Sequence, residues 1–277
     1  MMPVRDDLDT RMKTYYEQVP KFRLMRRTPV ALRLDGKAFH TFTKGFQKPF
    51  DEILVKSMQD TMKYLCENIQ GCVLGYTQSD EITLILVDYQ TLDTDAWFDY
   101  EIQKMCSIAA SMATMAFNRF FEFNLRWNYD IEYAMQYPEQ YNSEELKLIQ
   151  TYCNAISKGA MFDCRCFNIP KEEVTNLVYW RQLDATRNSI QMVGQANFSH
   201  KELQGKSCND IQDMLMLQKG INWNNYPTYL KRGSACLRLP DPEMPESERL
   251  KWTVDLDMPI LKGDNRKYVD NLVFIGD

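Results

Sequence analysis

The stretch VALRLDGKAFHTF, residues 30–42, combines an apolar strand with a carboxylate at its end. Apolar residues alternate along its first half, which predicts a half-buried strand. Asp35 and Gly36 stand where this strand leaves the predicted core. A second stretch, GYTQSDEITLIL, residues 75–86, places another acid, Asp80, in a predicted hairpin turn. The two stretches together suggest that the two acids meet.

The flanking segments extend this pattern into a fold. Asp51 is suited to cap a helix, Gly71 to stop it, and TQSD, residues 77–80, to turn a hairpin. The patterns predict strands at 29–35, 72–76, 81–87 and 161–170, and helices at 52–69, 97–121 and 171–196. This order, β-α-β-β-α-β followed by a helix, predicts an α+β, ferredoxin-like fold with an antiparallel sheet and both early helices on one face.

The chain is expected to divide near residue 170. Residues 1–170 would form the core, with an insertion at about 127–160 that carries one short helix. Residues 171–277 would form a helix-rich C-terminal portion, with one further strand in SACLRL, residues 234–239.

Composition places the chain among ordinary globular proteins. It has 277 residues, of which 44% are hydrophobic and 26% charged, and it has no apolar run of membrane-spanning length. The N-terminus has no secretory signal pattern. The eight cysteines form no CxxC pair and there are only two histidines, so we expect reduced thiols in the cytoplasm and no zinc site.

Charge is unevenly distributed along the chain. The net charge of −5 argues weakly against a nucleic-acid partner. However, six basic residues and one acid, Asp35, lie between residues 21 and 37: Lys21, Arg23, Arg26, Arg27, Arg33 and Lys37. This strip suits a polyanion that is delivered to a metal, and a solvated basic face is the alternative.

The acids carry the chemistry that we predict. In a split βαβ sheet the hairpin turn comes beside the end of the first strand, so Asp35, Asp80 and Glu81 would converge. Like charges repel at close range, and two Mg²⁺ ions about 3.5–4 Å apart would relieve this cost while assisting phosphoryl transfer. The Gly36 carbonyl could approach such a metal. The alternative is that both aspartates simply shape turns.

Residues after Asp35 suit a nucleotide. Lys37, His40, Lys44 and Lys48 follow closely, and DGKAFH, residues 35–40, could present backbone N–H groups and a cation to a triphosphate. A packed or surface histidine is the alternative for His40.

Six motifs occur in a recognisable order. They are RLDGKAFHTFTK, KPFD, GYTQSDEITLIL, FDCRCFNIP, YWRQLDATRNSIQ and NWNNYPTYLKRGS. Over roughly residues 20–235 the chain closely resembles the tRNA(His) guanylyltransferase superfamily, whose members extend RNA in the 3′-to-5′ direction. The resemblance implies a polymerase-like palm, which agrees with the topology above, and a homotetramer.

The resemblance also implies a mechanism and a site. A nucleoside triphosphate, usually ATP, would activate a tRNA 5′-monophosphate, and the 3′-hydroxyl of an incoming nucleotide such as GTP would attack it with two Mg²⁺ ions assisting. Asp35, Asp80 and the Gly36 carbonyl would be the metal ligands, with Glu81 as an acidic neighbour. The nucleotide site would comprise Lys37, Ala38, Phe39, His40, Lys48, Asp51, Ser79, Asp80 and Lys104.

One departure from the family pattern concerns substrate choice. Histidine-specific eukaryotic members carry HINNLYN, whereas this chain has Thr186, Arg187 and Ser189 in that segment and keeps Asn188. It therefore resembles the Thg1-like branch, which favours templated repair of tRNAs that lack 5′ nucleotides. The alternative within the family is addition of G at position −1 of tRNA(His). Candidate RNA-binding residues are Lys21, Arg23, Arg26, Arg27, Arg187, Asn188, Lys231 and Arg232.

Two rival functions come from other classes. A nucleotide cyclase would use a similar palm and two aspartates but would lack the KPFD and WRQ segments. An RNA-recognition module would need exposed aromatic residues on its central strands, which TLILVDY, residues 83–89, does not offer.

Overall fold

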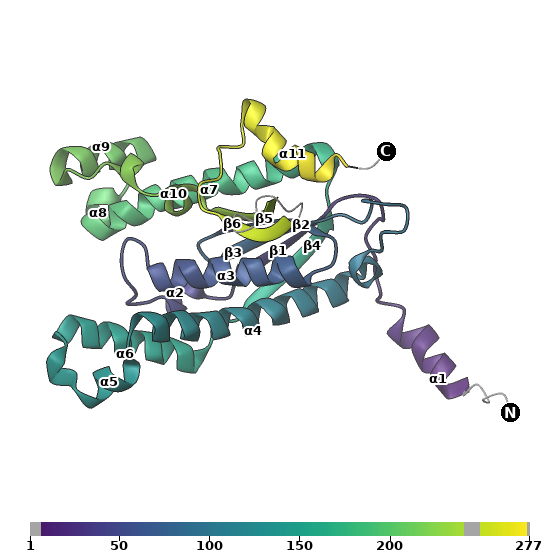
Figure 1. Cartoon of the computed structure of the whole chain (residues 1–277), viewed down its shortest axis with the longest axis horizontal. Coiled ribbons are helices and arrows are strands. Elements are labelled where there is room, and N and C mark those ends of the chain that lie inside the picture. The colour runs from purple at the N-terminus through teal and green to yellow at the C-terminus, as the bar shows by residue number, and fades with distance from the viewer. Residues whose placement is uncertain (1–6, 241–249, 276–277) are drawn as a thin grey trace.

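A six-stranded antiparallel sheet organises the molecule (Figure 1). The computed structural model describes residues 7–240 and 250–275. The strands are β1 (Val30–Gly36), β2 (Cys72–Gln78), β3 (Glu81–Leu86), β4 (Phe162–Asn168), β5 (Ser234–Pro240) and β6 (Leu250–Asp255), in the order β4-β1-β3-β2-β5-β6. The first four in this order form the predicted ferredoxin-like sheet. β5 confirms the strand predicted in SACLRL, and β6 was not predicted.

Two long helices cover one face of the sheet. They are α3 (Glu52–Asn68) and α4 (Ile102–Asn128). Asp51 caps α3 as predicted, because its side chain accepts a hydrogen bond from the Leu54 N–H at 2.9 Å. α3 packs closely on β2 at Gly75, where a Cβ atom would lie 2.5 Å from the Cys66 sulfur. Both early helices therefore lie on one face, as the sequence predicted.

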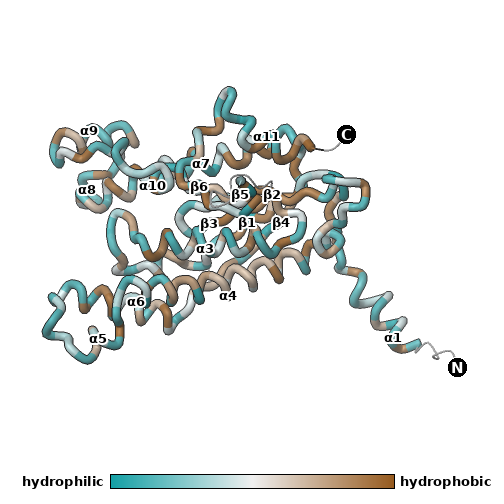
Figure 2. The backbone as a smooth tube through the Cα atoms, in the orientation of Figure 1, coloured by the Kyte–Doolittle hydropathy of each residue, from teal (hydrophilic) through white to brown (hydrophobic). Residues whose placement is uncertain are grey.

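A second core covers the opposite face. It is formed largely by α7 (Lys171–Asn197) and α11 (Lys267–Val273), which pack against apolar side chains of the central strands. Figure 2 shows hydrophobic stretches concentrated in these strands, between the two helical layers. Leu32 and Leu34 belong to the core under α3 and α4, whereas Ala31 belongs to the core under α7. Because side chains alternate along a strand, Arg33 and Asp35 point to the α7 side.

Two predicted segments differ from the structure. Residues 97–100 form a 3₁₀ turn, η2 (Trp97–Tyr100), with left-handed backbone at Phe98, and α4 begins only at Ile102. The insertion holds α5 (Ile131–Gln136), η3 (Pro138–Gln140) and a 16-residue helix, α6 (Ser143–Lys158), rather than one short helix. A capping box at Asn142 starts α6, and buried Tyr152 fixes it to the core.

The remaining elements are short. They are α1 (Asp7–Met12), η1 (Lys13–Glu17), α2 (Phe39–Phe42), α8 (His200–Leu203), α9 (Cys208–Lys219), η4 (Trp223–Asn225), α10 (Thr228–Arg232) and η5 (Gly263–Arg266). α1 extends away from the body of the molecule (Figure 1). The segment after residue 170 adds strands and a covering helix to the same sheet, and the domain boundary itself stays a prediction. All eight cysteines are free thiols.

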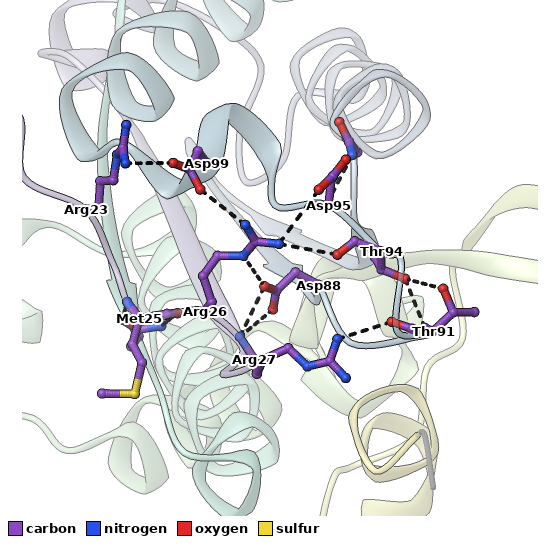
Figure 3. Close-up of polar contacts among 11 residues, drawn as sticks. Arg23, Met25, Arg26, Arg27, Asp88, Thr91, Thr94, Asp95 and Asp99 are labelled. Carbon is purple, nitrogen blue, oxygen red and sulfur yellow. Dashed lines mark hydrogen bonds and ion pairs between the residues drawn. The ribbon is translucent and has the colours of Figure 1, made fainter.

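Three arginines of the predicted basic strip, Arg23, Arg26 and Arg27, fold into a polar cluster with buried and exposed acids (Figure 3). Asp88 is fully buried and accepts hydrogen bonds from Arg26 Nε at 2.8 Å and from the Arg27 N–H at 2.9 Å. Asp99 accepts from Arg26 at 3.2 Å and pairs with Arg23 at 2.8 Å. Arg23 and Arg26 are therefore neutralised by acids. This cluster lies near the start of β1, whereas Asp35 lies at the end of that strand.

This cluster predicts a difference in stability between two substitutions. Asp88→Asn removes a buried charge that holds the chain before β1, so the free energy of unfolding should fall by on the order of 2–3 kcal/mol. Asp95→Asn is the matched control, because Asp95 also pairs with Arg26 but at 3.9 Å and with 85% of its side chain exposed; its effect should stay within about 0.5 kcal/mol. Urea unfolding of both variants measures this, and equal losses would contradict the role given to Asp88.

Candidate active site

The register of β1 and β3 brings the predicted acids together. Asp35 stands directly opposite Glu81 in this antiparallel pair. The hairpin turn is fastened to the end of β1, because the Gly36 N–H donates a hydrogen bond to the Asp80 carbonyl at 3.0 Å. The prediction that the hairpin turn lies beside Asp35 is therefore confirmed.

The carboxylates of Asp35 and Asp80 are available to a cation. Within residues 7–240 and 250–275, the Asp35 carboxylate has no hydrogen bond or ion pair, and Asp80 accepts one bond, from the Ser79 hydroxyl at 3.0 Å. Burial raises the pKa of Asp80, and the charge of Asp35 adds to this, against the opposing Ser79 bond. Two neighbouring carboxylates without a cationic partner in the described residues are suitable ligands for a divalent metal that prefers oxygen.

Glu81 is engaged differently. Its carboxylate lies 3.2 Å from Nε of Arg181 on α7, and Arg181 also donates to Asp184 at 2.6 Å. Burial raises the pKa of Glu81, although the charge of Arg181 opposes it. In the described part of the chain no three His, Cys, Asp or Glu side chains gather as a metal cluster. The metal-binding set that the geometry offers is therefore the pair Asp35 and Asp80, with Glu81 as an ion-paired neighbour.

Gly36 has a steric reason to be glycine. A Cβ atom at this position would overlap the ring of Phe39. Phe39 is itself buried in an aromatic cluster, with its ring centroid 5.4 Å from that of Phe117 and 5.2 Å from that of Phe162. Ala38 between them has left-handed backbone, with φ of 54°. Gly36 and Phe39 together fix the chain that follows Asp35.

A cavity of about 450 Å³ opens beside Asp80. It is lined by Gly36, Ala38, Phe39, His40, Thr43, Phe46, Gln47, Lys48, Pro49, Asp51, Leu54, Ser79, Asp80, Met192 and Gln195. Most of the predicted nucleotide-binding residues thus meet at one pocket. Lys37 is exposed nearby and its N–H donates to the Met161 carbonyl at 2.8 Å. Met192 and Gln195 were missed, because only the docking of α7 brings them there.

A narrower cavity of about 80 Å³ adjoins the first one. The two share Asp51, Leu54, Ser79 and Met192 in their walls. Asn188 and Ser189 of α7 line the narrower cavity, as does Gln59, whose amide donates to the Ser234 hydroxyl at 2.9 Å. The α7 segment that departs from the family pattern therefore faces the site.

Asp51 lines the pocket, but its carboxylate oxygens already accept hydrogen bonds from within the protein. In addition to the Leu54 N–H, the Gln47 N–H donates to this carboxylate at 3.0 Å and the Tyr152 hydroxyl donates to it at 2.6 Å. Only 4% of Asp51 is exposed. It holds the 47–51 loop and the start of α3, and the insertion contributes to the site through Tyr152.

Lys104 is not brought to the pocket of its own chain. Its ammonium lies 4.7 Å from the centre of the Phe98 ring. It stands in the first turn of α4, which contacts Cys166 of β4, and Cys166 is paired with Leu32 in the first half of β1. Because α4 begins at the opposite end of the sheet from Asp80, the structure does not bring Lys104 to this pocket, and its nucleotide-binding role stays a prediction.

The predicted RNA-binding residues fall into two groups. Arg187 and Asn188 are near the site, and both donate to Asp184, at 2.5 and 3.3 Å. Burial works to raise the pKa of Asp184, but Arg181 and these partners outweigh it, so the pKa is lowered. Lys231, which donates to the Asn224 carbonyl at 2.6 Å, and Arg232 belong to α10, which packs against α7. The second group, Lys21, Arg23, Arg26 and Arg27, lies at the far end of the sheet, where Lys21 pairs with Glu17 at 3.2 Å.

Comparison with known proteins identifies the family of the chain. A family model described as tRNAHis guanylyltransferase matches residues 9–170. The chain belongs to the tRNAHis guanylyltransferase family. Its members are nucleotidyltransferases, and so this chain is one.

Individual members of the family match over most of their length. The tRNA(His) guanylyltransferase of Saccharomyces cerevisiae is 28% identical, over 76% of this chain and 82% of that protein. A bacterial tRNA(His) guanylyltransferase (Thg1)-like protein, solved in complex with ATP, is 39% identical with a TM-score of 0.77 and covers 97% of this chain and 100% of its own. A bacterial Thg1-like protein in complex with GTP is 36% identical with a TM-score of 0.74, covering 98% and 100%.

No helix in the described ranges of this family member is both long and apolar enough to cross a membrane.

The close approach of Gly36 and Phe39 predicts a coupled pair of substitutions. Gly36→Ala should lower the free energy of unfolding by about 1–3 kcal/mol, since the added methyl group overlaps a buried ring. The smaller Phe39→Leu side chain should relieve part of this overlap, so the double variant should lose less stability than the sum of the single variants. Chemical unfolding of all three measures the coupling, and simple additivity would contradict the steric explanation.

The raised pKa of Asp80 predicts how stability depends on pH. When folding raises the pKa of an acid, its charged form destabilises the folded state at any pH above that raised pKa. This loss of stability disappears as the pH falls below the pKa that the acid has in the unfolded chain. Without divalent cations, Asp80→Asn should therefore raise Tm at pH 7, and this gain should vanish near about pH 3.

Added Mg²⁺ should reverse the order at pH 7, stabilising the unsubstituted protein and not the Asp80→Asn variant. Asp95→Asn, at the far end of the sheet, should respond to Mg²⁺ as the unsubstituted protein does. An equal Mg²⁺ response in the Asp80 variant would show that Asp80 holds no cation.

Proposed function

We propose that this chain adds nucleotides in the 3′-to-5′ direction to tRNAs that lack 5′ nucleotides, with the opposite strand of the acceptor stem as template. The observation that carries the proposal is the pair of carboxylates without a cationic partner in the described residues, Asp35 and Asp80. Asp80 lines a nucleotide-sized pocket, and Asp35 directly precedes Gly36 in the wall of that pocket. The two bacterial Thg1-like structures, one with ATP and one with GTP, support nucleoside triphosphates as substrates of this chain. We include in the proposal a homotetramer that acts in the cytoplasm.

The roles of the residues follow from their positions. Asp35 and Asp80, with the Gly36 carbonyl, would hold Mg²⁺, and two such ions would neutralise phosphate charge and lower the pKa of an attacking hydroxyl. Lys48 and His40, at the pocket wall, would face the triphosphate, and Ser79 would donate a hydrogen bond to it or to Asp80. The buried Asp51 would hold this wall in place.

The reaction would proceed in two displacements. In the first, an oxygen of the tRNA 5′-monophosphate attacks the α-phosphorus of ATP, and pyrophosphate leaves. In the second, the 3′-hydroxyl of the incoming nucleotide loses its proton and attacks the 5′-phosphorus of the tRNA, and AMP leaves. The protein contributes chiefly by aligning these groups in line and by compensating their charge.

The second candidate function is addition of G at position −1 of tRNA(His). The family model and the yeast relative favour it, since both are described by that activity. The α7 segment favours repair, since Thr186 and Ser189 replace residues of the histidine-specific pattern and Ser189 lines the narrower cavity. Ser189 also accepts a hydrogen bond from Trp223 at 3.0 Å.

One assay separates the two functions. The protein is incubated with Mg²⁺, ATP, all four nucleoside triphosphates and either a tRNA that lacks its first nucleotide or an intact tRNA(His). We expect extension of the truncated tRNA by the nucleotide that pairs with position 72, and a changed base at 72 should change the nucleotide added. Efficient addition of G to tRNA(His) without template-matched extension of any truncated tRNA would favour the second function.

A substitution tests the site in the same assay. Asp80→Asn should reduce extension by on the order of 100-fold or more, because it removes a charge that the transferred phosphate requires through the metal. The affinity for tRNA should change little, which a filter-binding measurement checks. The Asp95→Asn variant serves as the control, and undiminished extension by Asp80→Asn would refute the assignment.

A further inference from the structure

Two rows of charge cross the α7 side of the sheet. In register across β3, β1 and β4 lie three acids, Glu81, Asp35 and Asp163. Two residues earlier along β1, on the same face, Arg33 stands directly opposite Arg165 of β4. The two rows are separated by about 7 Å, twice the rise of a strand residue. A basic row therefore adjoins the row that carries the predicted metal ligands.

Acids neutralise the basic row only in part. In the described parts of the chain Arg33 has no ion pair, and its Nε atom is buried without a hydrogen-bond partner. Arg165 pairs with Asp163 at 3.3 Å and leaves 52% of its side chain exposed. Like charges placed directly opposite each other destabilise an antiparallel pair. An anion between the two guanidinium groups would remove this repulsion.

An indole ring stands over this row. Trp180 of α7 is 51% exposed, and its ring centre lies 5.8 Å from the Arg33 guanidinium and 4.1 Å from that of Arg181. Arg181 is the residue paired with Glu81, and its Nε atom, in a side chain only 7% exposed, has no hydrogen bond within the described ranges. The indole thus lies beside both rows and keeps half of its surface open.

We propose that Arg33, Arg165 and Trp180 bind the RNA strand next to its reacting 5′ end. The two guanidinium groups take a backbone phosphate, and the indole ring stacks on a base. Proteins bind unpaired nucleotides by this combination of cationic groups and aromatic platforms. This subsite rests on the proposed function. The RNA would bind on the α7 face of the sheet, while the nucleotide would occupy the pocket beside Asp80.

The subsite also explains the basic strip. Arg26 and Arg27 are fastened to Asp88 at the far end of the sheet. Arg33 alone among the arginines of the strip shares a face with Asp35, two residues away. Because side chains alternate along β1, Arg33 is the arginine of the strip that can contact RNA bound beside Asp35.

RNA binding without catalysis tests the subsite. The affinity of a truncated tRNA is measured in EDTA, without nucleotides, at several salt concentrations. Trp180→Ala should weaken binding by roughly 5- to 100-fold, and Trp180→Phe should restore part of it. Arg165→Gln should lower the slope of log K against log salt by about 0.7–0.9. Arg238→Gln is the matched control, since Arg238 stands 5.1 Å over Trp252 on the other side of the sheet, in β5 and β6.

The outcomes separate the subsite from the proposed function. If the protein extends truncated tRNA but Trp180→Ala and Arg165→Gln keep full affinity and salt slope, the subsite is refuted and the function stands. If these variants lose affinity for ATP or GTP while tRNA binding is unchanged, the surface binds a triphosphate and the proposal is overturned. An equal loss in Arg238→Gln would show unspecific charge attraction, which also overturns it. A failure of extension with intact RNA-binding effects would instead refute only the proposed function.

Discussion

The antiparallel register of β1 and β3 is the constraint on which the site depends. It places Asp35 opposite Glu81 and fastens the hairpin turn to the end of β1 through the Gly36 N–H and the Asp80 carbonyl. A shift of one residue would turn every side chain of β1 to the other face and would bury Asp35 among the apolar residues under α3 and α4. The two cores on either side of the sheet oppose such a shift, so the same apolar side chains that fold the sheet also fix the carboxylates.

Some acids near this sheet have a cationic partner in the described residues and others do not. The buried acid Asp88 is compensated by Arg26 and the Arg27 N–H, and Glu81 is paired with Arg181. Asp35 and Asp80 have no such cation in the described residues, and burial raises the pKa of Asp80. Unpaired charge that is partly withdrawn from water is costly. Its concentration beside a pocket, where a metal and a triphosphate would compensate it, is therefore typical of a functional site.

Much of this site could be predicted from sequence because its residues are close in the chain. The strand ending on Asp35, the turn holding Asp80 and the loop from Gly36 to Asp51 each follow local rules of periodicity, turn formation and capping. The helices of the insertion and the limits of the helix predicted over residues 97–121 were harder to predict. Their limits depend on packing against the core and on the left-handed backbone at Phe98. The distance of Lys104 from the pocket was not visible in the sequence for a related reason, since a motif does not show which way the helix that carries it runs.

The sequence by itself determined the β-α-β-β-α-β order of the core, the meeting of Asp35 and Asp80, and the membership of the family. These follow from local patterns and from several motifs in a fixed order. The tertiary structure alone decided which basic residues are neutralised, which residues of α7 face the pocket, and that Arg33, Arg165 and Trp180 adjoin the acids. The physical reason is that ion pairing and burial depend on contacts between segments far apart in sequence, such as Arg26 with Asp88 and Arg33 with Trp180, which a linear pattern does not encode.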